Sequence, residues 1–209
     1  MFREIKKNKL LPAVTVTDVH SALLVAEALL EGGINVMEIT FRTSATAEAI
    51  RAIARELPEM KVGAGTILSP DQLSAAQEAG AQFGLSPGLN KQVVEKAQEH
   101  EFPFIPGVST PSDIELALTY GHKMLKLFPV SDLGGENYIG SLEGPYKHTG
   151  VRFLVMGGVN LSNLKSYLES DMVTAAGGSW LTPSDLIREK KFKQITAIVR
   201  ESVILAEQG

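Results

Sequence analysis

The residue of this sequence with the clearest chemical potential is Lys126, which lies in the apolar run Met124–Pro129. Its neighbours favour a buried strand, and burial disfavours the charged form of a lysine. A neutral amine is a nucleophile that forms a Schiff base with a carbonyl group. The alternative is a strand-end lysine whose ammonium reaches water along its aliphatic stem. The sequence alone leaves both interpretations open.

Glu38 is a candidate acid or base to accompany this lysine, because it lies in a second apolar strand and shares a face with Val36 and Thr40. A carboxylate in a partly desolvated pocket is suited to proton transfer. The alternative is a structural ion pair with Lys126. Arg42 follows at the mouth of the strand, where its guanidinium can hold a substrate carboxylate through two hydrogen bonds, or stand as a solvated loop arginine.

Further candidates mark the ends of other predicted strands. Thr66 follows two glycines, and its hydroxyl can donate to the same carboxylate or cap the next helix, a role also open to Ser69. The pairs Gly157-Gly158 and Gly177-Gly178 occupy the loops after two successive strands, where bare N–H groups can bind phosphate and Ser179 adds a hydroxyl. Turns use glycine routinely, but two such pairs indicate a phosphorylated ligand.

The composition excludes other kinds of site. The chain contains no cysteine, which rules out thiol catalysis, disulfides and thiolate metal sites. Its four histidines are scattered, without the close pair of a zinc helix, so we expect no metal. The net charge of -4 argues against a nucleic-acid partner. No apolar stretch of signal-peptide or membrane-span length follows Met1–Leu10, so we expect no membrane partner and a cytoplasmic location.

Short apolar strands alternate with amphipathic helices along the chain, after a short N-terminal helix. The predicted strands are Pro12–Val16, Asn35–Thr40, Lys61–Gly65, Gln82–Leu85, Pro103–Ile105, Lys123–Phe128, Arg152–Met156 and Met172–Ala176. The predicted helices include Val19–Leu30, Ala45–Leu57, Pro70–Ala79, Lys91–Glu99, Pro111–Thr119, Leu161–Leu168 and, weakened by paired glycines, Asp132–Leu142. Continuous apolar strands that alternate with helices indicate a parallel sheet covered by helices.

The predicted fold is α/β, a single (β/α)8 TIM barrel over residues 1–209. No linker or low-complexity tract divides the chain, and 44% hydrophobic residues suffice for one sizeable core. An open doubly wound sheet would carry a Gly-rich turn after its first strand, and Thr15–Asp18 is no such turn. Active sites of barrels collect at the C-terminal ends of the strands, the ends that carry the candidates above.

Together these segments resemble the class I 2-keto-3-deoxy-6-phosphogluconate (KDPG) and 4-hydroxy-2-oxoglutarate (KHG) aldolases, essentially from end to end. The segments that carry the resemblance are Glu38–Thr43, Gly63–Thr66, Ser86–Leu89, Ile105–Val108, Lys126–Pro129 and Gly177–Trp180. The resemblance implies that Lys126 is the Schiff-base lysine and Glu38 the acid/base. It further implies that Arg42 and Thr66 bind the pyruvate end, that the glycine loops with Ser179 bind phosphate, and that the barrels form a homotrimer.

One candidate departs from the family pattern. The candidate substrate-binding residues are Arg42, Thr66, Pro87, Phe128, Met156, Gly157, Gly158, Gly178 and Ser179. Members active on the phosphogluconate-derived substrate commonly have threonine at the position of Met156. A thioether cannot donate a hydrogen bond, so a buried substrate hydroxyl would lose a partner, at a cost of about 1–3 kcal/mol. A branch specific for the galactonate-derived epimer also lacks this threonine, which indicates relaxed or altered stereochemical choice.

The expected function is a reversible Schiff-base cleavage of KDPG, its galactonate epimer or KHG to pyruvate and glyceraldehyde 3-phosphate or glyoxylate. The expected ligands are a small-molecule keto acid and a sugar phosphate. No cofactor is expected, because an imine on Lys126 is itself an electron sink. Two alternatives remain: a phosphate-binding barrel isomerase or synthase that uses Lys126 only as a charge, and a sugar-phosphate-binding protein without catalytic activity.

Overall fold

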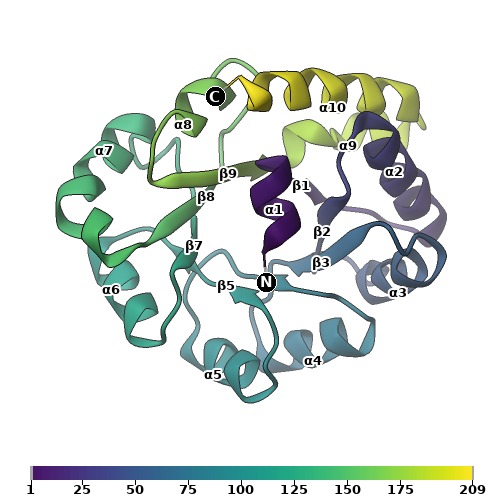
Figure 1. Cartoon of the computed structure of the whole chain (residues 1–209). Helices are drawn as coiled ribbons and strands as arrows, with labels where there is room; N and C mark the ends of the chain where they lie inside the picture. Colours follow the sequence, from purple (N-terminus) through teal and green to yellow (C-terminus); the bar gives the residue numbers. More distant parts are fainter. Residues whose placement is uncertain (1, 209) are drawn as a thin grey trace.

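The strands form a parallel barrel with helices around its outside (Figure 1), in a computed structural model that describes residues 2–208. The strand order is β5-β4-β3-β2-β1-β9-β8-β7-β6. Each strand pairs in parallel with its neighbours in this order, as an alternating βα sequence requires. The predicted TIM-barrel fold is confirmed. The predicted domain ends, Met1 and Gly209, lie outside the described residues.

Eight strands were expected, and the structure has nine because the fifth is divided. The strands are β1 (Leu10–Val14), β2 (Val36–Thr40), β3 (Lys61–Gly65), β4 (Gly84–Leu85), β5 (Phe104–Ile105), β6 (Gly107–Val108), β7 (Met124–Leu127), β8 (Arg152–Met156) and β9 (Val173–Gly178). β5 pairs with β4 whereas β6 pairs with β7, and Pro106 lies between them. Proline has no N–H to give to a strand ladder, so β5 and β6 are two halves of one barrel strand.

Apart from α1 (Arg3–Asn8), which covers one end of the barrel, the helices lie around its outside (Figure 1). The others are α2 (Val19–Gly32), α3 (Thr46–Glu56), α4 (Pro70–Glu78), α5 (Lys91–Glu99), α6 (Pro111–Thr119), α7 (Gly135–Tyr146), α8 (Leu164–Leu168), α9 (Ser184–Arg188) and α10 (Phe192–Glu207), with short 3-10 helices at Lys147–Thr149 and Ser179–Leu181. Side chains of Asp18, Ser69, Asn90 and Thr110 cap α2, α4, α5 and α6. These caps explain why the predicted starts of these helices agree with the structure.

Some predicted ends were wrong by a few residues. β1 begins at Leu10 rather than Pro12, because Leu10 already pairs with Ala176 of β9. The weak prediction Asp132–Leu142 is a helix that begins at Gly135 and continues to Tyr146. No helix or strand was predicted after Ala176. In the structure α10 lies there and packs against α2 so closely that a Cβ on Gly32 would overlap Val199.

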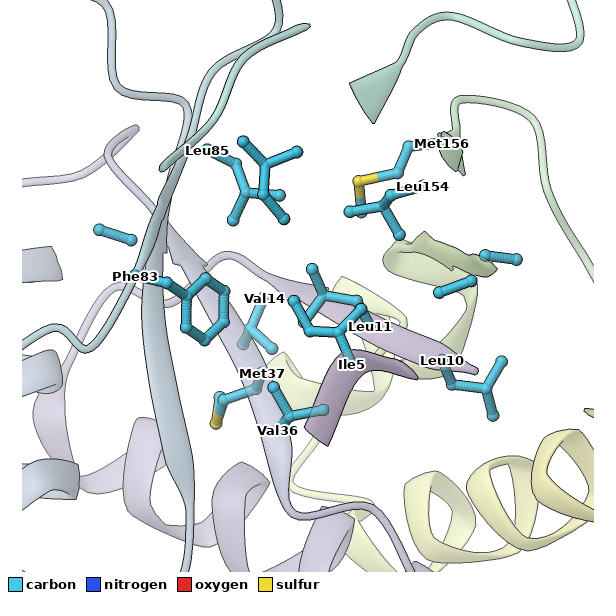
Figure 2. Close-up of a cluster of buried hydrophobic side chains, with 14 of the residues drawn as sticks. Ile5, Leu10, Leu11, Val14, Val36, Met37, Phe83, Leu85, Leu154 and Met156 are labelled. Carbon is cyan, nitrogen blue, oxygen red and sulfur yellow. The ribbon is translucent and has the colours of Figure 1, made fainter. Parts of the chain in front are cut away.

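The N-terminal end of the barrel is closed by α1, which lies across the ring of strands (Figure 1). Its Ile5 is only 2% exposed and belongs to the same buried cluster as Leu11, Met37 and Leu154 (Figure 2). Asn35, just before β2, donates to Glu4 Oε2 at 3.1 Å and so fixes the helix to the barrel. The described helices include none with the length and apolar character needed to cross a bilayer.

Candidate active site

A cavity of about 140 Å³ lies at the C-terminal ends of the strands, opposite α1. All the predicted site residues except Pro87 line it: Lys126, Glu38, Arg42, Thr66, Phe128, Met156, Gly157, Gly158, Gly178 and Ser179. A larger hollow of about 280 Å³ beside α1 contains none of them. Size therefore does not identify the site, whereas the convergence of polar groups from many strands does.

Strand alternation explains how β2 presents its polar side chains. Val36 lines the hollow beside α1, while Glu38, Thr40 and Arg42 line the cavity at the other end. Val36, Glu38 and Thr40 follow one another at intervals of two, so they lie on the face of β2 that points into the barrel. Arg42 lies in the turn just after the strand. The predicted common face of Val36, Glu38 and Thr40 is thus observed.

Lys126 and Glu38 face each other inside the barrel. Lys126 Nζ lies 3.8 Å from Glu38 Oε1, and the two side chains are 8% and 1% exposed. The same amine lies 5.4 Å from the centroid of the Phe128 ring. Their strands, β7 and β2, are not neighbours in the sheet, so closure of the barrel brings the two groups together. The Lys126 side chain therefore does not extend into bulk solvent, the alternative that the sequence left open.

The Glu38 carboxylate occupies space that glycine leaves open. A Cβ on Gly65 would overlap Glu38 Oε2, which makes no hydrogen bond to any described residue. An unpartnered buried carboxylate oxygen remains available to accept a proton or a hydrogen bond from a ligand. Glu38 is also the single carboxylate among the lining residues. Within residues 2–208, no three His, Asp or Glu side chains are arranged to hold a metal ion.

Two further groups suited to anions lie on the same wall. Arg42 is exposed at the end of β2, and no carboxylate of residues 2–208 forms an ion pair with it. Thr66 has φ 58°, the left-handed region, which is unfavourable for a β-branched residue. Such a conformation costs about 1–3 kcal/mol and persists where the surroundings impose it. The fold therefore keeps the Thr66 hydroxyl at the cavity wall at the expense of stability.

The glycine loops complete the opposite wall. Gly157 and Gly158 follow β8 with φ 91° and 82°, and Gly178 ends β9 with φ 159°. A Cβ on Gly157 would overlap Pro129, and one on Gly158 would overlap Ser131. Both positions therefore require glycine for reasons of backbone conformation and of space. Bare backbone and the Ser179 hydroxyl meet at this wall, which suits an oxyanion.

Pro87 is not among the residues that line the cavity. It follows β4, and its carbonyl group contacts the place where a side chain on Gly107 of β6 would begin. The neighbouring Ser86 hydroxyl donates to Gly88 O at 2.6 Å and fixes this turn. The structure thus places Pro87 in the packing between two strand ends.

Four residues that line the cavity had no predicted role: Ala13, Thr15, Thr40 and Val159. The hydroxyls of Thr15 and Thr40 lie 2.8 Å apart and form a hydrogen bond across the ends of β1 and β2. Thr40 could have been found from its shared face with Glu38. Thr15 was harder to find, because the predicted first strand extended past it to Val16, whereas β1 ends at Val14.

The chain matches a known protein family over most of its length. A family model described as KDPG and KHG aldolase matches residues 2–198. The chain belongs to the KDPG and KHG aldolase family. A 2-dehydro-3-deoxy-phosphogluconate aldolase of Treponema pallidum is 42% identical over 203 residues, which cover 97% of this chain and 96% of the relative. The KHG/KDPG aldolase of Escherichia coli K12 is 43% identical over 192 residues, 92% of this chain and 89% of the relative.

Solved structures of KDPG aldolases share the barrel. The enzyme from Legionella pneumophila, with pyruvate captured at low pH as a covalent carbinolamine intermediate, has a TM-score of 0.90 and 32% identity, covering 94% of this chain and 95% of that one. The enzyme from Zymomonas mobilis ZM4, with 3-phosphoglycerate, has a TM-score of 0.88 and 33% identity, covering 98% and 97%. The agreement extends over nearly the whole length of each chain.

Proposed function

We propose that this aldolase cleaves a 2-keto-3-deoxy-6-phospho sugar acid, or its relative KHG, with Lys126 as the Schiff-base lysine and Glu38 as the acid/base. The products are pyruvate and glyceraldehyde 3-phosphate, or glyoxylate from KHG. The observation that carries the proposal is the buried Lys126 amine, 3.8 Å from one carboxylate in a cavity that also contains Arg42. The covalent pyruvate adduct of the Legionella relative supports the same chemistry.

The first step forms the electron sink. The neutral Lys126 amine attacks the C2 ketone to give a carbinolamine, which loses water to become a protonated imine. Arg42 and Thr66 hold the neighbouring carboxylate, the guanidinium through charge-assisted hydrogen bonds. The apolar walls near the amine, including Phe128 and Met156, keep bulk water away from this end of the cavity.

The second step breaks the carbon–carbon bond. Glu38 takes the proton of the C4 hydroxyl, the C3–C4 bond breaks, and its electron pair flows into the imine to leave an enamine and a free aldehyde. Glu38 then returns the proton to C3, and water releases pyruvate from the resulting imine. The unpartnered Glu38 Oε2 and its 1% exposure suit this proton transfer, because no protein group competes for the oxygen.

The remaining assignments rest on the resemblance and on the placement of the loops. The Gly157-Gly158 and Gly178 loops with Ser179 receive the phosphate, and the 3-phosphoglycerate bound by the Zymomonas relative supports an anion of this kind. We further propose a single-domain barrel that works as a homotrimer in the cytoplasm, without metal or organic cofactor. A role of Pro87 in substrate binding would be indirect, through the turn that it forms beside Gly107.

Borohydride reduction in the presence of pyruvate tests the proposal. We expect one reduced pyruvate unit on Lys126, located by peptide mass spectrometry, and none in Lys126→Ala, which should have no cleavage activity. Lys123→Ala, at an exposed lysine just before β7, is the matched control and should be labelled normally. Glu38→Gln should still form the adduct but cleave about 10²- to 10⁴-fold more slowly. Normal turnover by Lys126→Ala would refute the scheme. An unchanged mass of the wild-type protein after treatment with pyruvate and borohydride would instead support an isomerase or synthase that uses Lys126 only as a charge.

A further inference from the structure

In the loop after β8, the carbonyl groups of two consecutive residues, Gly157 and Gly158, are held by hydrogen bonds from elsewhere in the chain. Gly157 O accepts a hydrogen bond from Ser131 N at 3.0 Å, and Gly158 O accepts one from Asn163 Nδ2, also at 3.0 Å. Both peptide bonds are trans, so each following N–H points away from the carbonyl of its own peptide group. The N–H groups of Gly158 and Val159 therefore face away from these partners, toward the cavity that both residues line.

These two N–H groups are free to bind a ligand. In the part of the chain that the structure describes, neither donates a hydrogen bond to the protein. Gly157 and Gly158 have positive φ angles of 91° and 82°, which glycine adopts without strain, so the backbone at this point of the loop carries no side chain that would cover its N–H groups. The loop thus presents two donors to one point of the cavity wall.

The two carbonyls are held by different means. Gly157 O is held by the backbone of Ser131, whereas Gly158 O receives hydrogen bonds from side chains alone, Asn163 Nδ2 at 3.0 Å and Asn160 Nδ2 at 3.4 Å. Asn163 is itself fixed, because its Oδ1 accepts from Asn160 N at 2.8 Å. Asn163 does not line the cavity, so it acts on a ligand only through the peptide that it holds.

We propose that Asn163, assisted by Asn160, is a positioning residue that orients the Gly158–Val159 peptide for the phosphate group of the substrate. The inference rests on the phosphate site proposed above and adds the residues that set its geometry. A glycine peptide without this anchor can rotate, and rotation removes a donor from the phosphate. The keto-acid end of the cavity is built by β2 and β7 and does not depend on this loop.

The effect of removing the Asn163 side chain must therefore depend on whether the substrate carries a phosphate. KDPG has one, whereas KHG ends in a carboxylate and needs no phosphate site. We expect Asn163→Ala to raise the KM for KDPG about ten- to a hundredfold, the value of a charge-assisted hydrogen bond. Its kcat and KM for KHG should stay within about twofold of the wild type, because the reacting groups are untouched. Inorganic phosphate should inhibit KHG cleavage more weakly in the variant.

Asn90→Ala is the matched control. Asn90 also lies at the C-terminal end of the barrel and also donates its side-chain amide to a loop carbonyl, Leu68 O at 3.1 Å, but neither residue lines the cavity. This variant should keep the wild-type KM for both substrates. Asn160→Ala keeps the 3.0 Å bond from Asn163 to Gly158 O and loses the longer 3.4 Å one, together with the bonds that Asn160 Oδ1 accepts from Ser162 N and Oγ at 2.9 and 2.6 Å. It should raise the KM for KDPG less than Asn163→Ala does.

Different failures have different meanings. An equal change of KM for KDPG and KHG in Asn163→Ala, or no change for either, would overturn the positioning role. Should Asn163→Ala not fold, the same split between substrates in Asn160→Ala decides the matter. If wild-type protein is not inhibited by inorganic phosphate and binds KDPG no better than KHG, the phosphate site itself is wrong, and the inference falls with it.

Discussion

The geometry of Lys126 and Glu38 supports the proposed reactive pair over a purely structural ion pair. Burial of two opposite charges is costly and is compensated only when each is fully hydrogen-bonded. Here Nζ and Oε1 are 3.8 Å apart, beyond hydrogen-bonding distance, and Oε2 has no partner in residues 2–208. A pair selected for stability would be closer and better satisfied. Their incomplete hydrogen bonding instead leaves the carboxylate able to interact with a substrate in the cavity that both residues line.

Met156 is the residue at which we expect substrate choice to be decided. It is 3% exposed, lines the cavity and lies next to Gly157. Met156→Thr introduces a hydroxyl at this wall, so the ratio of kcat/KM for KDPG over its galactonate epimer should rise about 5- to 150-fold. Competition between the two epimers measures this ratio directly.

The control for this variant is Met156→Val, which has the shape of threonine without the hydroxyl. It should leave the epimer ratio close to that of the wild type if hydrogen bonding, rather than volume, decides the choice. An equal shift in both variants would mean that space alone controls selection. An unchanged ratio in Met156→Thr would remove the proposed role.

Among the elements, α6 depends on one carboxylate for its start. Asp113 Oδ2 accepts from Ser109 N and Oγ at 3.0 and 3.1 Å, and from Thr110 N and Oγ1, both at 2.9 Å. Burial raises the pKa of Asp113, but these hydrogen bonds outweigh it and hold the pKa below the ordinary 3.8. The charged form is therefore favoured in the folded state, and α6 begins with a full capping box.

The pH dependence of this cap follows from the direction in which folding shifts the pKa of Asp113. A carboxylate whose pKa is lowered by folding adds stability above its unfolded pKa of 3.8 and loses it as pH falls through its lower folded value. Asp113→Asn should therefore lower the free energy of unfolding by about 1 kcal/mol at pH 6. The difference from wild type should shrink below pH 3.8, as measured by urea unfolding at a series of pH values. A difference that stays constant with pH would show that the charge is not involved.

Element positions could be predicted from the sequence where local chemistry decides them. Asp18, Ser69 and Thr110 cap helices that begin where expected, because a cap acts within one turn. The division of a strand at Pro106 and the early start of β1 could not, because both depend on pairing with strands far away in the chain.

The same contrast, between features set by local chemistry and features set by distant parts of the chain, holds for the site. Glu38, Lys126 and the glycine pairs were found because their types are unusual in apolar strands or at strand ends. Thr15 was missed because its importance comes only from the strand end that it shares with Thr40, which the closed barrel defines. Asn163 carries no sign of its role in sequence, since its contact is with a carbonyl group of a loop.

At the scale of the whole molecule, the two ends of the barrel have separate tasks. One end is closed by α1 and filled by apolar side chains such as Ile5 and Phe83 (Figure 2). The other end carries the polar cavity. Stability at the N-terminal end supports the strained Thr66 and the buried, unpartnered carboxylate at the other. A change at the closed end should thus alter stability without altering chemistry.

Ile5→Ala tests this separation. Ile5 is 2% exposed at the closed end, so removal of its side chain should leave a cavity and lower the free energy of unfolding by about 2–5 kcal/mol. At temperatures where the variant is folded, kcat and KM should stay within about twofold of wild type, because Ile5 does not line the active-site cavity. Ile204→Ala, at a residue 57% exposed on α10, is the control and should change neither property. Loss of catalytic efficiency in folded Ile5→Ala, measured beside its urea unfolding curve, would mean that the two ends are coupled through the barrel interior.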